Sequence, residues 1–159
     1  MNRLSMMMVA LVIALGSGFA AHAAAMSDPA IGTWVLNVEK SKFTPGPAPK
    51  SQTRIYTQTA DGVTLTISGV AADGSTMSGT STFKYDGKDY PISGSPDYDT
   101  LTLKRVNGST VSSVQKLNGK IVARTTRTIS GHGKVLTLTS KGTSSKGAAY
   151  HNVYVFDKQ

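Results

Sequence analysis

The sequence lacks cysteine and has little tryptophan, histidine and acid. Its 159 residues include no Cys, one Trp, three His and nine Asp or Glu, against 17 Lys or Arg. Without cysteine the fold cannot depend on disulfides, and a lipid anchor on an N-terminal cysteine is excluded. Two histidines beyond the N-terminal region, His132 and His151, and no thiolate leave few ligands for a transition metal. We therefore expect no metal and no cofactor.

Long hydrophobic runs are confined to the N-terminus. Asn2 and Arg3 form a basic start, residues 4–19 are apolar, and Ala21 and Ala23 place small residues where a signal peptidase cleaves. The apolar run is shorter than the roughly 20 residues that a membrane helix needs. These features predict a signal peptide at residues 1–25, cut after Ala23 or after Ala25. They also predict one domain over residues 26–159, periplasmic or secreted, with no transmembrane segment after cleavage.

Negative charge is missing from the C-terminal half. The net charge is +8, and no acidic residue lies between Asp99 and Asp157. A half of the chain whose charges are almost all positive attracts anions, so an anionic envelope polymer is a candidate partner. The basic residues are spread out rather than clustered, which favours the alternative that they form solvated strand faces and turn tips that keep a β-protein soluble. We expect a monomer and no nucleic-acid partner. The basic residues of this half are Lys104, Arg105, Lys116, Lys120, Arg124, Arg127, Lys134, Lys141 and Lys146.

Turn signals divide the rest of the chain into short alternating runs. Asp-Gly and Asn-Gly pairs between such runs are typical of hairpins, because type I′ turns need positive φ at both central residues. In residues 63–70, Val63, Leu65 and Ile67 alternate with polar residues. No stretch has apolar residues at helical spacing over three turns. The predicted strands are residues 32–37, 52–59, 63–70, 77–85, 88–92, 99–106, 110–117, 120–130, 134–141 and 148–156.

Two stretches interrupt this rhythm. Residues 38–43 fit a single helical turn, and the three prolines of residues 45–49 force an extended crossing. Residues 84–105 contain a predicted hairpin at Asp86-Gly87 and then a Gly- and Pro-containing break at residues 93–96. We expect residues 90–98 to form part of the rim of any cavity. The aspartates of this stretch could bind calcium, but their spacing fits ordinary turn chemistry better.

These patterns predict an all-β fold. Consecutive hairpins give an antiparallel up-and-down meander of about eight to ten strands, which removes its edges by closing into a barrel; a sandwich is the alternative. The Gly32-Thr33-Trp34 motif before a hairpin meander resembles the lipocalin and fatty-acid-binding-protein (calycin) superfamily. The segments GTWVLNVEKSKF, KYDGKDYPISGSPDYDT and NVYVFDK are also similar to small exported lipocalin-like proteins of bacteria. The resemblance implies a ligand-binding barrel.

Two features depart from that resemblance. Lipocalins pack an arginine from a late strand over the tryptophan, and residues 150–156 contain no arginine. Fatty-acid-binding proteins insert a helix pair after the first strand, where this chain has the proline-containing residues 38–50. The resemblance therefore implies no particular ligand.

Candidate ligand-binding residues are cations and aromatics on strand faces. Arg127 shares a face with Ala123 and Ile129, so it is a candidate for the barrel interior. An inward arginine needs a carboxylate or a ligand anion, because an unpaired buried charge is costly. Arg54 and Tyr56 share a face and are similar to the Arg-x-Tyr pair that binds carboxylates in fatty-acid-binding proteins. That pair lies there on a late strand, where this chain has Asn152-Val153-Tyr154. The alternative is that Arg54, Arg124 and Arg127 all face water. The predicted ligand-binding residues are Arg54, Tyr56, Arg127, Tyr154 and Trp34.

The predicted inner faces are rich in Ser and Thr. The large apolar residues suffice to fill a small barrel but not to line a spacious lipophilic cavity. They are Trp34, Leu36, Ile55, Val63, Leu65, Ile67, Phe83, Leu101, Leu103, Ile121, Ile129, Leu136, Leu138, Val153 and Val155.

No catalytic motif is evident. There is no Gly-x-Ser-x-Gly elbow between a strand and a helix, and no acidic residue adjoins a candidate histidine. Asp89, Asp97 and Asp99 could form carboxylate pairs, but nothing marks one as a proton donor. We expect a non-enzymatic exported barrel that binds a small amphipathic or anionic ligand. The alternative is a structural or interaction protein of the cell envelope whose basic C-terminal half contacts anionic polymers or a protein partner.

Overall fold

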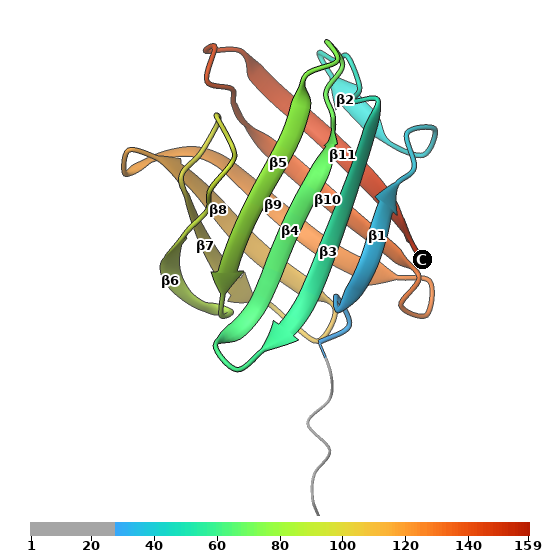
Figure 1. The fold of residues 1–159 in the computed structure, drawn as a ribbon, viewed down its shortest axis with the longest axis vertical. Coiled ribbons are helices and arrows are strands. Elements are labelled where there is room, and N and C mark those ends of the chain that lie inside the picture. The colour runs from blue at the N-terminus through green and yellow to red at the C-terminus, as the bar shows by residue number, and fades with distance from the viewer. Residues whose placement is uncertain (1–27) are drawn as a thin grey trace, which may run out of the picture.

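The computed structural model describes residues 28–159; the predicted signal peptide lies outside them. This part of the chain consists of eleven strands (Figure 1) and contains no helix long and apolar enough to span a bilayer. The strands are β1 Gly32–Leu36, β2 Lys42–Thr44, β3 Ser51–Thr59, β4 Gly62–Val70, β5 Thr76–Phe83, β6 Asp86–Pro91, β7 Thr100–Arg105, β8 Thr110–Leu117, β9 Lys120–Ser130, β10 Val135–Thr143 and β11 Ala149–Lys158.

The strands form one antiparallel sheet that curls into a nearly closed barrel. Its order is β5-β4-β3-β1-β11-β10-β9-β8-β7-β6, and β2 pairs with β11 beside β1. The first strand β1 joins the two ends of the meander by pairing with both β3 and β11. The predicted all-β antiparallel barrel is confirmed.

The barrel seam lies between β5 and β6. Within residues 28–159 an isolated bridge crosses this seam, between Thr80 of β5 and Ser93, two residues after the end of β6; its two backbone hydrogen bonds are each 3.0 Å long. The Ser81 hydroxyl adds a hydrogen bond to the carbonyl oxygen of Pro91 at 2.8 Å. The hairpin predicted at Asp86-Gly87 is therefore wrong: the register shift between Asp86 and Asp89 marks a β-bulge within β6. Gly87 has φ 78°, which a bulge can require just as a hairpin turn does.

The segment after β1 also differs from the prediction. A turn is present, since the amide of Ser41 donates to the carbonyl of Val38 at 3.1 Å, but residues 42–44 form the short strand β2. Phe43 on β2 packs edge-on against Tyr154 of β11, with ring centroids 5.0 Å apart. β2 thus pairs with β11 beyond the part of β11 that pairs with β1, and continues the barrel wall there.

Alternation along the strands builds the core. Val63, Leu65 and Ile67 on β4 are all buried, as their spacing predicts, and Trp34, Phe83, Leu136 and Phe156 are fully enclosed. Two expected inner residues are exposed instead: Ile55 (39%) because it alternates with Arg54 and Tyr56, and Ile121 (51%) because a register shift at Gln115 and Lys116 reverses the alternation there. Val153 and Val155 are only half-buried because Tyr154 and Phe156 take the inner positions.

Candidate ligand-binding cavity

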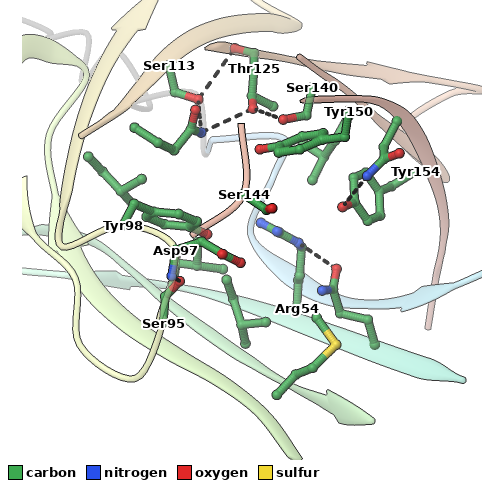
Figure 2. A pocket seen from close by; sticks show the side chains of 18 of the residues that line it. Arg54, Ser95, Asp97, Tyr98, Ser113, Thr125, Ser140, Ser144, Tyr150 and Tyr154 are labelled. Atoms are coloured by element: carbon green, nitrogen blue, oxygen red, sulfur yellow. Dashed lines mark hydrogen bonds between the residues drawn. The ribbon is translucent and has the colours of Figure 1, made fainter. Parts of the chain in front are cut away.

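The barrel encloses a cavity of about 490 Å³, a volume typical of small-molecule sites. Residues from four connecting segments line one end of it: Pro45, Ala71, residues 94–98 and Ser144. Figure 2 shows Asp97, Tyr98, Ser144 and Tyr150 gathered there around the open space. Across this end the Asp97 carboxylate accepts a hydrogen bond from the amide of Ser145 at 2.9 Å, so two of these segments are joined.

The cavity wall has an apolar and a polar side. β4, β5 and β7 contribute Leu65, Ile67, Phe83, Leu101 and Leu103, whereas β8, β9 and β10 contribute mainly polar side chains beside Val111 and Leu138. The apolar side gives a hydrocarbon body a place to leave water, which stabilises binding by about 25 cal/mol per Å² buried. The polar residues of the wall on β8, β9 and β10 are Ser113, Gln115, Thr125, Ser140 and the charged Arg127.

Arg127 is the deepest cation of the cavity. Its side chain is only 6% exposed, and its Nη2 donates to the Tyr85 hydroxyl at 3.0 Å and lies 3.7 Å from the Asp28 carboxylate. Its guanidinium carbon lies over the rings of Tyr56 and Tyr85, at 5.1 and 5.3 Å from their centroids. Nε and Nη1 are buried, and within residues 28–159 neither has a hydrogen-bond partner. Arg127 thus lines the cavity with a guanidinium whose donors are only partly used by the described chain.

Asp28 closes the barrel beneath Arg127. Its carboxylate, also 6% exposed, pairs with Arg105 at 3.2 Å and accepts the Ala30 amide at 2.9 Å. Burial opposes ionisation of Asp28, but the nearby Tyr85 hydroxyl, the Ala30 amide and two guanidinium groups outweigh it, so the pKa of this carboxyl lies below its ordinary value. One carboxylate thus faces two guanidinium groups, and of these three charged groups Arg127 alone lines the cavity.

A second arginine stands higher on the opposite wall. Arg54 on β3 is half-buried, and its Nε donates to the Gln52 side chain at 3.3 Å (Figure 2). Among residues 28–159 it forms no ion pair. Burial opposes ionisation of the Tyr56 phenol, but Arg54 and Arg127 outweigh it and lower the pKa of Tyr56. Both guanidinium groups therefore lie close enough to Tyr56 to favour the ionised form of its phenol.

Four of the five predicted ligand-binding residues line this cavity. Arg54 and Tyr56 from β3, Arg127 from β9 and Tyr154 from β11 come together there. Trp34 does not line it: the indole is fully buried in the core, and its Nε1 donates to the carbonyl of Ala30 at 2.7 Å. Whether any of the five contacts a ligand stays a prediction.

Inner faces rich in Ser and Thr were predicted, but the sequence did not single out Ser113, Gln115, Thr125 or Ser140 as lining residues. On β8 Ser113 and Gln115 flank Val114, and on β9 Thr125 follows Arg124. The sequence pattern therefore does not show which face of either strand points into the barrel. Only the buried neighbours Val111 and Ala123, on the same strand faces, could have indicated that these side chains point inward.

The aspartates of residues 84–105 serve local structure. Asp86 accepts from the Lys88 amide at 3.0 Å, Asp89 pairs with Lys116 at 2.7 Å, and Asp99 accepts from the Asn118 amide at 2.9 Å. Within residues 28–159 no group of His, Asp and Glu is arranged to hold a metal ion. These carboxylates do not converge on the cavity; only Asp97 reaches it, at its open end.

Comparison with known proteins identifies the fold. No protein-family model and no curated protein matches the sequence. The crystal structure of zebrafish ileal bile acid-binding protein complexed with cholic acid matches with a TM-score of 0.50 and 14% identity, covering 82% of this chain and 99% of that one. This chain has the fatty-acid-binding-protein-like barrel fold. The siderocalin Ex-FABP, described as functioning through dual ligand specificities, is more distant, with a TM-score of 0.37 and 10% identity over 82% of this chain and 74% of that one.

In this barrel a lysine of the last strand lies over the tryptophan ring. Lys158, at the end of β11, lies opposite Trp34 in the sheet, and its Nζ is 5.1 Å from the centre of the indole ring. Residues 150–156 contain no arginine for this position, and Lys158 occupies it instead. The contact ties the last strand to the first at the point where the barrel closes.

Proposed function

We propose that this protein binds a small amphipathic anion in its barrel cavity and performs no catalysis. The observation that carries the proposal is Arg127, a buried guanidinium of the cavity wall whose Nε and Nη1 have no partner within residues 28–159. The same cavity is lined by Arg54, which forms no ion pair with those residues. Leaving donors of a buried charged group unsatisfied is costly, so a carboxylate, sulfate or phosphate that enters the cavity gains charge-assisted hydrogen bonds. The apolar wall of β4, β5 and β7 accommodates the rest of the ligand.

The fold supports a binding role. The zebrafish protein of the same fold was crystallised with cholic acid, which is itself an amphipathic acid. At 14% identity this likeness carries no ligand over, and the argument for an anion rests on the arginines. The predicted signal peptide further leads us to propose that binding takes place outside the cytoplasm, in the periplasm or in the medium.

A matched pair of probes tests the proposal. Dodecanoate and 1-dodecanol share a hydrocarbon chain and differ in charge, so calorimetric titration of each isolates the contribution of the anionic group. We expect dodecanoate to bind at least tenfold more tightly, and native mass spectrometry of protein from its own host to show a co-purifying anion. Equal affinities for the two probes, or binding of neither, would contradict an anion-binding cavity.

A row of exposed basic side chains supports a second candidate function, contact with an anionic envelope polymer. Lys141 on β10 is paired in register with His151 on β11 and with Arg124 on β9, and all three are exposed. In the described part of the chain neither Lys141 nor Arg124 has an acidic partner. Like charges directly across a sheet are unfavourable, and an anionic polymer would relieve that repulsion. Retention on a heparin column that drops in the variant R124Q/K141Q, but not in K40Q, would support this function; unchanged retention would contradict it.

A further inference from the structure

Polar side chains form a continuous band across four neighbouring strands of the cavity wall. In the sheet register Ser113 on β8 lies opposite Thr125 on β9, Thr125 opposite Ser140 on β10, and Ser140 opposite Asn152 on β11. All four line the cavity, as does Gln115, two residues farther along β8. Figure 2 shows Ser113, Thr125 and Ser140 side by side, linked by hydrogen bonds.

The hydrogen bonds of this band leave one acceptor unused. Gln115 Nε2 donates to the hydroxyls of Ser113 and Thr125, at 3.3 and 3.1 Å. The Thr125 hydroxyl in turn donates to Ser140 at 2.8 Å, and the Ser113 hydroxyl donates to the Thr125 carbonyl at 3.4 Å. Both hydroxyl protons are therefore committed, which fixes the orientation of the Gln115 amide. Its Oε1 is buried, and no group in the described part of the chain donates to it.

A buried acceptor without a donor is unfavourable, and since none of residues 28–159 donates to Gln115 Oε1, a bound molecule that carries a donor would satisfy the band. A plain hydrocarbon chain cannot supply one, and it would also cover the polar band with methylene groups. A hydroxyl group can donate to Gln115 Oε1 and accept from its neighbours. A ligand that carries such a hydroxyl group would therefore bind more tightly than a simple fatty acid that lacks it.

The sheet register gives the distance between this band and the anion site. Thr125 is two residues from Arg127 along β9, and Gln115 lies opposite Ala123, four residues from Arg127. At the rise of an extended strand these separations are about 7 and 13 Å. We infer that the ligand is an anionic amphiphile that carries a hydroxyl group about 7–13 Å from its anionic group. This inference rests on the proposed function and narrows its substrate class.

The test compares stearate with two monohydroxystearates. One isomer carries the hydroxyl in the middle of the chain, within reach of the band, and the other carries it next to the carboxylate. We expect the mid-chain isomer to bind about three- to tenfold more tightly than stearate, the effect of one net hydrogen bond. The other isomer should show no such gain. The hydrophobic effect alone would predict weaker binding of the mid-chain isomer than of stearate, because the added hydroxyl group makes transfer of the ligand out of water less favourable.

Variants locate the effect. Gln115→Leu should remove the mid-chain preference while the ligand-free protein unfolds at the same or a higher temperature, because an unsatisfied group is lost. Thr125→Val should weaken the preference. Thr126→Val makes the same chemical change one residue away, on the exposed face of β9, and should leave the preference unchanged.

The outcomes separate the two proposals. Binding of stearate and both isomers with equal affinity would overturn the hydroxyl inference and leave the anion-binding proposal standing. A mid-chain preference that persists in both Gln115→Leu and Thr125→Val would also overturn the inference, because the hydroxyl would then be bound elsewhere. If none of the three acids binds, the proposed function fails and the inference fails with it.

Discussion

Removing the charge of Asp28 should destabilise the barrel strongly, and the effect should depend on pH. Asp28→Asn keeps an acceptor for the Ala30 amide but leaves Arg127, 6% exposed, without a carboxylate. Breaking a buried ion pair costs about 3–5 kcal/mol. Arg105 is 36% exposed and can be hydrated, so the lower end, about 3 kcal/mol, applies here. With an unfolding entropy of about 2.1 cal/mol/K per residue, this loss lowers the Tm of a domain of about 130 residues by about 10 °C.

The sign of the pH dependence follows from the pKa of Asp28, which folding lowers. A carboxylate of this kind stabilises the fold fully above its unfolded pKa of about 4, and this contribution disappears as the pH falls through the lower folded value. The Tm difference between wild type and Asp28→Asn should therefore be largest near neutral pH and shrink below about pH 4. Thermal unfolding followed by circular dichroism measures it. A difference under about 2 °C at neutral pH, or one that stays constant down to about pH 2, would refute the reasoning.

Two further predictions concern the core and the backbone. Trp34→Phe should lower the free energy of unfolding, measured in urea, by about 1–3 kcal/mol, because a buried indole and its hydrogen bond to Ala30 are lost. The affinity for dodecanoate should stay within twofold of wild type. A larger loss of affinity would place Trp34 in the binding site. Gly69→Ala should cost about 1–3 kcal/mol, because its Cβ would lie 2.3 Å from the carbonyl oxygen of Ser51. Gly108→Ala, with no atom within 4 Å of its Cβ, is the matched control, and equal effects of the two would contradict this steric account.

The fold could be predicted from the sequence because its signals are local. Asn107-Gly108 and Asn118-Gly119 separate paired strands as hairpin turns do, and the alternation of Val63, Leu65 and Ile67 places them in the core. Asp86-Gly87 was misassigned because the same positive φ serves a hairpin turn and a β-bulge. The distinction depends on pairing across the seam, which a local pattern does not contain.

The candidate site could be predicted only in part for a similar reason. Arg127 shares its face with Ala123 and Ile129, and this alternation alone indicates an inward arginine. Its partner Asp28 lies 99 positions earlier in the chain, and no local pattern connects the two. The polar band depends on the register of β8 to β11, since Ser113, Thr125, Ser140 and Asn152 become neighbours only when the sheet forms.

The most direct test of an anion-binding interior compares two arginines of one strand. Arg127→Gln and Arg124→Gln change the net charge equally, but Arg127 lines the cavity and Arg124 is exposed. The loss of a charged hydrogen bond, about 1.5–3 kcal/mol, predicts that dodecanoate binds about 10- to 100-fold more weakly to Arg127→Gln. Arg54→Gln, which leaves the Asp28 pair intact, should also weaken binding, whereas Arg124→Gln should bind within twofold of wild type. Equal affinities in folded Arg127→Gln and Arg124→Gln, measured by calorimetry, would contradict the account.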